Sequence, residues 1–226
     1  MQQRNEILET INNNQTFALF GHEHIDGDAL GAILAFGSLL EKQGKTVSYF
    51  SPHSPGRVFE FLQWQHKVQT NFDYGNYEVL IFLDFNHYQR ISPFSIGHED
   101  YFEQRQKIVI DHHKADKTME NTLMYRDTSE ISTCSLITTL TSKCWSHLYD
   151  SQIATYLYMG LSTDSGNFRY DEGEQSIHTF ATALQLLKFG AKKTTIINEI
   201  FRNKTYHSIQ FMQLLLQRMQ KIKILT

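Results

Sequence analysis

The 226-residue chain has few cysteines, little net charge and no long apolar run, and each shortage excludes a class of protein. Its two cysteines, Cys134 and Cys144, lie ten residues apart without a second pair. They therefore form neither a zinc knuckle nor a disulfide framework. We expect both to be buried or partly buried thiols in a protein of a reducing compartment.

The charge balance and the hydrophobic pattern exclude two kinds of partner. A net charge of −3 provides no basic field for long duplex nucleic acid, although a local site could still bind a short polyanion. No apolar run approaches the ~20 residues that span a bilayer. The polar N-terminus, MQQRNEILETINNN, has no apolar segment typical of a signal peptide. We expect a cytoplasmic protein without a membrane partner.

The apolar patterns predict an α/β domain. Short apolar runs predict strands, and apolar residues at helical spacing predict helices. Strands alternate with helices up to about residue 125 and helices follow, which favours a mostly parallel sheet of about five strands flanked by helices. The strands are expected at residues 16–20, 46–50, 79–83, 107–110 and 121–125, and the helices at 3–13, 29–40, 57–64, 130–147, 151–161, 175–189, 191–202 and 205–222.

The strongest apolar runs are followed by histidines and acidic residues. The chain is also rich in histidine, with 11 histidines against three prolines. The carboxyl ends of parallel strands meet at one edge of a sheet, where ligands bind. These side chains should therefore lie close together. They are His22 after residues 16–20, Asp84 after 79–83, Asp111, His112 and His113 after 107–110, and Asp164 after the apolar helical stretch 153–161.

Carboxylates and imidazoles without thiolates suit hard or borderline divalent ions such as Mn²⁺ or Mg²⁺. Two such ions about 3.5–4 Å apart can clamp a phosphoryl group and activate water. Each residue alone has an ordinary alternative, because an aspartate at a strand end is usually a cap and a histidine pair is usually solvated. Four such clusters at four predicted element ends favour a metal site.

Four segments resemble the motifs of the DHH phosphoesterases. Residues 21–31 (GHEHIDGDALG) resemble the first motif, in which two aspartates follow a histidine at +4 and +6. Asp84 followed by Arg90 resembles the second, residues 110–113 (IDHH) the third, and residues 160–169 (GLSTDSGNFR) the fourth. All four occur in order, and the chain looks most like the bacterial oligoribonuclease (nanoRNase) and 3′-phosphoadenosine 5′-phosphate phosphatase branch.

The resemblance implies two divalent ions, with Mn²⁺ expected and Mg²⁺ as the alternative. It implies His22, Asp26 and Asp84 for one ion, and Asp28, Asp84, His112 and Asp164 for the other, so that Asp84 bridges them. His113 would face the substrate phosphate, and Asp111 would orient an imidazole. Arg90 and Arg169 are candidates for phosphate contact, with a surface salt bridge as the alternative.

The implied function is hydrolysis of short oligoribonucleotides (nanoRNA), of 3′-phosphoadenosine 5′-phosphate, or of both. One alternative is a phosphodiesterase for cyclic di-AMP or its linear product pApA. The other is a truncated metal-binding module with little activity. The expected partner is a short oligoribonucleotide or small nucleotide, and a homodimer is also considered.

The chain departs from the family pattern at two places. His24 and Ile25 stand where the family commonly has Asn and Pro, which leaves the role of His24 open. The branch also has a smaller C-terminal domain with a glycine-rich motif that ends in His, and no such run occurs here. We therefore expect a catalytic domain over residues 1–204 and a linker helix over 205–226. That helix carries an apolar stripe of Phe211, Leu214, Leu215, Met219 and Ile222, and the chain is either a fragment or a natural single-domain protein.

Overall fold

The centre of the protein is a parallel β-sheet. The computed structural model describes residues 2–114, 119–203 and 206–219. Within them the sheet has six strands in the order β3-β2-β1-β4-β5-β6, and every neighbouring pair is parallel. The strands are β1 (Thr16–Phe20), β2 (Thr46–Phe50), β3 (Val68–Gln69), β4 (Val79–Leu83), β5 (Gln106–Asp111) and β6 (Thr122–Arg126). The predicted fold class is confirmed, and the sixth strand is β3, whose two residues are too few to form a pattern.

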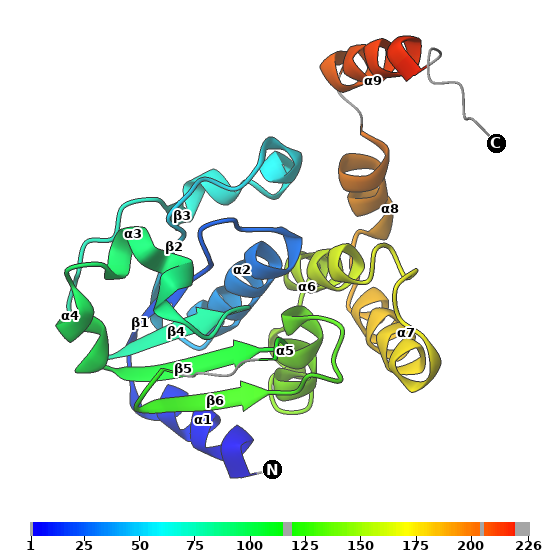
Figure 1. Cartoon of the computed structure of the whole chain (residues 1–226). Coiled ribbons are helices and arrows are strands. Elements are labelled where there is room, and N and C mark those ends of the chain that lie inside the picture. Colours follow the sequence, from blue (N-terminus) through cyan, green and yellow to red (C-terminus); the bar gives the residue numbers. More distant parts are fainter. Residues whose placement is uncertain (1, 115–118, 204–205, 220–226) are drawn as a thin grey trace.

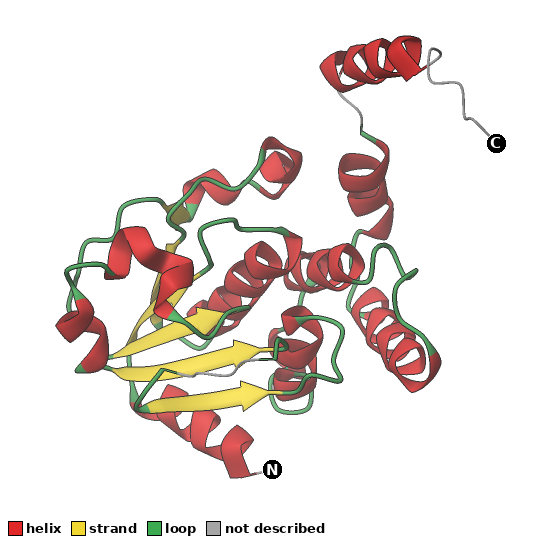
Figure 2. Ribbon diagram, in the orientation of Figure 1, coloured by secondary structure: helices red, strands yellow, loops and turns green. Residues whose placement is uncertain are grey.

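Helices flank this sheet, as Figures 1 and 2 show. The longer ones are α1 (Gln2–Asn13), α2 (Gly27–Lys42), α5 (Thr133–Thr141), α6 (Ser151–Asp164), α7 (Gly173–Lys188) and α9 (Tyr206–Met219). The shorter ones are α3 (Ser92–Ser95), α4 (Glu99–Glu103) and α8 (Lys193–Ile196). Short segments of 3₁₀-helix occupy Arg57–Leu62, Trp64–His66, Tyr88–Ile91 and Ser146–Leu148, and a π-helical segment covers Ile197–Arg202.

Capping residues account for two differences from the predicted helix boundaries. Helix α2 begins before residue 29 because Asp26 accepts hydrogen bonds from the amides of Asp28 and Ala29. The helix expected over 130–147 begins only at Thr133, because Ser132 caps it through the amide of Ser135. It ends at Thr141, and a separate turn follows. Cys134 is buried as expected, but Cys144 is exposed, and both thiols are free.

Alternate residues of the strands build two hydrophobic cores. Phe17 and Leu19 of β1 face the larger core beneath α1, α2, α5 and α6. Ala18 and Phe20 face the opposite core, which lies beneath α3 and α4 and is mainly aromatic. There the rings of Phe20 and Phe82 stack with their centroids 5.1 Å apart. The central strands β1, β4 and β5 are thus buried on both faces, which leaves their carboxyl ends as the accessible edge.

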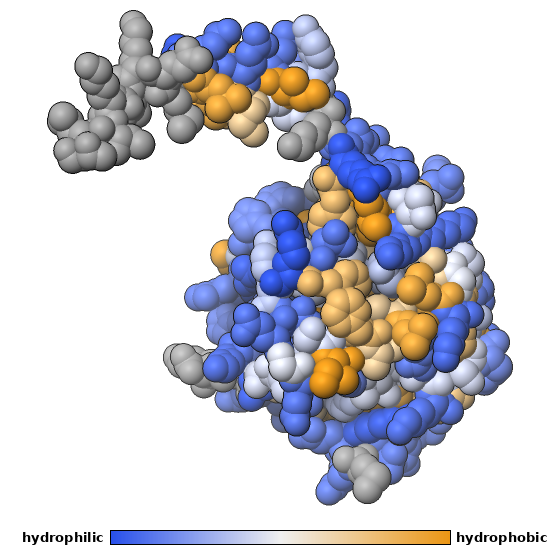
Figure 3. Space-filling view, turned by 90° about the vertical axis from the view of Figure 1, so that its right-hand side faces the viewer, coloured by the Kyte–Doolittle hydropathy of each residue, from blue (hydrophilic) through white to orange (hydrophobic). Residues whose placement is uncertain are grey.

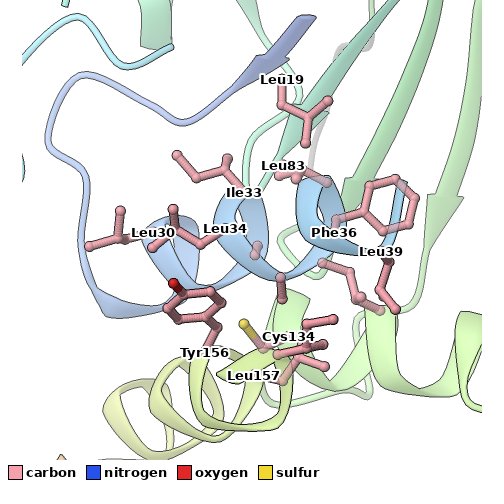
Figure 4. Packing of buried hydrophobic residues seen from close by; sticks show 14 of the residues in the cluster. Leu19, Leu30, Ile33, Leu34, Phe36, Leu39, Leu83, Cys134, Tyr156 and Leu157 are labelled. Carbon is pink, nitrogen blue, oxygen red and sulfur yellow. The ribbon is translucent and has the colours of Figure 1, made fainter. Parts of the chain in front are cut away.

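Helices α2 and α6 cross at unusually close range because glycines face each other there. Helix α2 lies between the strand residues Leu19 and Leu83 and the α6 residues Tyr156 and Leu157 (Figure 4). A Cβ on Gly31 would lie 2.5 Å from the carbonyl oxygen of Tyr156. Gly31 therefore permits close contact between α2 and α6.

Gly160→Ala should destabilise the protein. A Cβ there would lie 2.3 Å from Sγ of Cys134 and 2.5 Å from Oδ1 of Asp28. Overpacking costs about 1–3 kcal/mol, against the ~1 kcal/mol that alanine gains over glycine inside a helix. Since both contacts are shorter than 3 Å, the cost should be near its upper end, with a net loss of about 2 kcal/mol and a fall in Tm of roughly 4–8 °C in thermal denaturation. Gly56→Ala is the control, because only Cγ1 of Val58, 3.9 Å away, lies near its Cβ position. An unchanged Tm for Gly160→Ala would contradict the close crossing.

The outer helices expose apolar side chains. Ile177, Phe180, Leu184 and Leu187 of α7 are between 39% and 72% exposed, and apolar atoms gather on this face in Figure 3. Helix α9 lies away from the sheet (Figure 1) and exposes Phe211, Leu214 and Leu215 of the predicted stripe. The Met219 side chain and Ile222 lie outside the described residues. The division at residue 204 stays a prediction.

Among the described helices, none has both the length and the apolar character needed to cross a membrane.

Candidate metal centre

The predicted ligands meet at the carboxyl edge of the sheet. Strand β1 pairs with β2 on one side and with β4 on the other, so the order of the strands reverses between β1 and β4. His22 follows β1 and Asp84 follows β4, on the two sides of this switch point. Open parallel sheets bind ligands in the crevice at such a point. The fold therefore brings residues that are 62 positions apart to one site.

The first group consists of His22, Asp26 and Asp84, whose potential ligand atoms lie within 4.8 Å of one another. Nε2 of His22 is 3.9 Å from Oδ2 of Asp26 and 3.6 Å from Oδ2 of Asp84. Oδ1 of Asp26 is occupied by the amides at the start of α2, which leaves Oδ2 for the site. This is the set that the resemblance implied for one ion.

The second group consists of Asp28, His112 and Asp164, which also lie within 4.8 Å of one another. Nε2 of His112 is 3.3 Å from Oδ2 of Asp164 and 3.5 Å from Oδ1 of Asp84. Nδ1 of His112 lies 3.3 Å from the carbonyl oxygen of Glu130. A proton on Nδ1 would make that contact a hydrogen bond and leave the Nε2 lone pair facing the carboxylates.

Asp84 lies between the two groups. Its side chain is 2% exposed, with Oδ2 near His22 and Oδ1 near His112. Its φ of 71° is in the left-handed region, which is uncommon for a residue other than glycine. The amide of Asp84 donates to the carbonyl of Ile110 at 3.0 Å, which holds this turn against β5. The backbone thus directs the carboxylate to a position between two imidazoles.

The crowding of these groups changes their proton affinity. Burial raises the pKa of Asp28 to about 7, and the charge of Asp164 adds to this rise. Burial and the neighbouring carboxylates also raise the pKa values of Asp84 and Asp164. Burial lowers the pKa of His22 to about 4. Burial also lowers the pKa of His112, but Asp164 and Asp28 outweigh it, and the net change is upward.

The arrangement fits divalent cations. Nε2 of His112 is buried and has no hydrogen-bond partner among the described residues. Four carboxylates converge there, and among the described residues no Lys or Arg forms an ion pair with them. A buried cluster of like charges with an unpaired imidazole nitrogen is costly unless it is neutralised. Oxygen and imidazole donors suit Mn²⁺ or Mg²⁺.

His113 and Asp111 form a second pair beside this centre. Nδ1 and the amide of His113 approach Oδ1 of the buried Asp111 at 2.8 and 3.1 Å, and Asn86 donates to Oδ2. Although burial raises the pKa of Asp111, these hydrogen bonds bring it below its ordinary value. An ionised Asp111 holds the proton of His113 on Nδ1. Oδ1 of Asp84 is 3.6 Å from the same nitrogen, so the pair adjoins the centre.

Arg90 and Arg169 differ in their surroundings. Arg90 lines a cavity of about 440 Å³ together with Asp84, His113 and Lys114. Nε of Arg169 instead donates to the carbonyl of Gly166 at 2.6 Å, within its own turn. Arg169 is not among the residues that line the cavity, and its phosphate contact stays a prediction.

His24 lies outside both groups. Its side chain is 77% exposed, and its ring stacks on His53 with a centroid distance of 5.9 Å. Nδ1 of His53 in turn lies 2.7 Å from the carbonyl of Glu23.

The residues that hold the carboxylates in place were not predicted from the sequence. The amides of Thr133 and Cys134 donate to Oδ2 and Oδ1 of Asp28 at 2.6 and 2.9 Å. The hydroxyl of Thr133 donates to Oδ1 of Asp84 at 2.9 Å. The serine cap at Ser132 marks the start of α5, but nothing local to this segment indicates that the helix begins at the metal centre.

Comparison with known proteins identifies a family and several relatives. Residues 16–161 match the family described as "DHH family, N-terminal domain". The chain is 24% identical over 217 residues to the "Bifunctional oligoribonuclease and PAP phosphatase NrnA" of Mycoplasma pneumoniae, covering 95% of this chain and 65% of that protein. It is 25% identical over 171 residues to the protein of the same name from Mycoplasma genitalium, covering 74% and 52%.

A solved structure shares the fold. It is an exopolyphosphatase-related protein from Bacteroides fragilis, with a TM-score of 0.85 and 21% identity over 96% of this chain and 65% of that one. The chain thus spans about two thirds or less of the length of each of these proteins. The family match covers well over half of the chain and includes the first three motifs. The chain therefore belongs to the DHH family.

Proposed function

We propose that this chain is a phosphoesterase that uses two divalent metal ions, most simply Mn²⁺, to hydrolyse short oligoribonucleotides or 3′-phosphoadenosine 5′-phosphate. The observation that carries this proposal is the division of the Asp84 oxygens between two groups of imidazoles and carboxylates. A shared carboxylate is what a pair of ions a few ångströms apart requires. The choice of substrates follows the names of the Mycoplasma relatives, which are called oligoribonuclease and PAP phosphatase.

The residues of the site have distinct roles in this proposal. His22, Asp26 and Asp84 would hold one ion, and Asp28, Asp84, His112 and Asp164 the other. When bound, two such ions neutralise phosphoryl oxygens and favour deprotonation of the attacking water. Asp111 would accept a hydrogen bond from Nδ1 of His113, so that the doubly protonated ring could give its Nε2 proton to the leaving oxygen and become neutral. Arg90 and Lys114 add positive charge to the cavity, where the rest of an anionic substrate would lie.

The test is hydrolysis by the purified chain in Mn²⁺ and in EDTA. The substrates are 5′-labelled di- to pentaribonucleotides and 3′-phosphoadenosine 5′-phosphate, with cyclic di-AMP, pApA and a long RNA duplex as comparisons. We expect Mn²⁺-dependent release of mononucleotide or phosphate from the first two, and no reaction on the duplex. If pApA were hydrolysed faster than these two substrates, the chain would be assigned as a pApA phosphodiesterase instead. Two-ion binding without turnover of any substrate would instead favour a metal-binding module.

Arg90→Gln should weaken substrate binding more than it slows the reaction. A hydrogen bond to a charged group contributes about 1.5–3 kcal/mol, which corresponds to a roughly 10–100-fold rise in KM. We expect kcat to stay within a few-fold of the wild type in steady-state kinetics. Arg57→Gln, an exposed arginine on another turn, is the control. An unchanged KM for Arg90→Gln would mean that Arg90 is only a surface residue.

The homodimer, the linker role of α9 and the cytoplasmic location stay predictions.

A further inference from the structure

We infer that Thr133 is a positioning residue that keeps the carboxylate of Asp84 divided between the two metal positions. This inference rests on the proposed function and adds a residue to it. Thr133 is completely buried and is the first residue of α5, directly after the Ser132 cap. It contacts Asp84 through its hydroxyl and Asp28 through its amide. It is thus bonded to carboxylates from both groups.

The hydrogen bond of Thr133 limits how Asp84 can turn. Oδ1 accepts the Thr133 hydroxyl at 2.9 Å and also lies 3.5 Å from Nε2 of His112. Oδ2 lies on the other side, 3.6 Å from Nε2 of His22. Rotation of the carboxylate about its Cβ–Cγ bond would break the bond to Thr133. The hydroxyl therefore favours the orientation in which one oxygen faces each group, over one in which both oxygens face the same group.

The backbone of α5 fixes Thr133 itself. The first two amides of the helix donate to the two oxygens of Asp28, as helix N-termini do toward anions. Ser132 closes the turn by accepting from the amide of Ser135 at 3.0 Å. Asp28, α5 and Asp84 are thus linked, although Asp28 and Thr133 are 105 residues apart in the sequence. Partners of this kind typically change metal affinity by about 10–100-fold.

The test compares Thr133→Val with Thr133→Ser. Valine keeps the shape and removes the hydroxyl, whereas serine keeps the donor. Thr138→Val is the matched control, because Thr138 is also buried in α5 and its hydroxyl donates to the carbonyl of Cys134, at 2.8 Å, and not to a carboxylate. Each protein is titrated with Mn²⁺ by calorimetry, and the spin coupling of the bound Mn²⁺ pair is followed by electron paramagnetic resonance. Circular dichroism verifies that each variant is folded.

We expect Thr133→Val to bind one Mn²⁺ normally and the second about 10–100-fold more weakly, with loss of the coupled signal. Its kcat should fall while KM changes little, and Thr133→Ser and Thr138→Val should resemble the wild type. Two normally bound, coupled ions in Thr133→Val would overturn the inference and leave the proposed function standing. An equal loss in Thr138→Val would also overturn it, since general packing would then be the cause. A wild-type chain that binds no Mn²⁺ would instead refute the metal site itself.

Discussion

Asp84→Asn should lower metal-dependent phosphoester hydrolysis by at least about 1,000-fold. The variant removes the one carboxylate that faces both groups of ligands, and metal ions contribute several kcal/mol of transition-state stabilisation. Asparagine has nearly the same volume as aspartate and tolerates the left-handed backbone found at φ 71°. The loss would therefore follow from charge and not from strain. The measurement is kcat/KM in Mn²⁺, with calorimetry to count the bound ions.

A matched control makes this result specific. Asp100→Asn makes the same chemical change at an exposed position in the first turn of α4. It should leave both the activity and the number of bound ions unchanged. If Asp84→Asn retained more than a tenth of the wild-type activity, Asp84 would not be the shared ligand. If the variant lost activity but still bound two ions, Asp84 would act on the substrate.

Mn²⁺ should stabilise the folded chain more strongly as the pH rises. The raised pKa values of Asp28, Asp84 and Asp164 mean that the metal-free fold favours their protonated forms. The stability that this proton uptake supplies is complete below about pH 4, the ordinary carboxyl pKa, and is lost as the pH passes the raised values, about 7 for Asp28. The lowered pKa of His22 has the opposite effect, because it makes the folded state gain stability as the pH rises. This gain is confined to the range between its pKa of about 4 and the ordinary value of 6.5. Above about pH 6.5 the metal-free protein should therefore lose stability.

The expected difference is large enough for thermal denaturation. At 100 times its Kd, a bound ion adds about 2.7 kcal/mol, which raises the Tm by roughly 5–10 °C. Comparing Mn²⁺ with EDTA from about pH 5.5 to 8.5 should show this rise at the upper end and little at the lower, because the ligands must lose protons to bind. Asp84→Asn should show a much smaller rise at every pH. A Tm rise independent of pH would contradict ligation by these carboxylates.

The elements that the sequence predicts well are those with a continuous local pattern. Residues 79–83 form an apolar run that is buried throughout β4, and the strand lies where the pattern places it. The order of the strands was not predicted, because a run of apolar residues does not say which strand is its neighbour. Helices α3 and α4 were missed because four or five residues are too few to show a helical period.

The candidate site was predictable because its residues follow elements that have a clear local pattern. Its residues follow predicted strands or helices, and parallel strands bring their carboxyl ends to one edge. Thr133 was not predictable in this way. Its contacts with Asp84 and Asp28 span 49 and 105 residues, and the mid-chain sequence around it resembles any capped helix. Only the packing of α5 against α2 and α6 shows what this helix start faces.

The position of β1 in the middle of the sheet would also decide when the proposed cations could first bind during synthesis. β1 is made before both of its neighbours, β2 and β4. The second group of ligands also needs Asp164, at the end of α6. A nascent chain that does not yet include Asp164 would therefore lack a complete pair of the proposed sites. Pairing of distant parallel strands is slow, so cation uptake should mark a late step in folding.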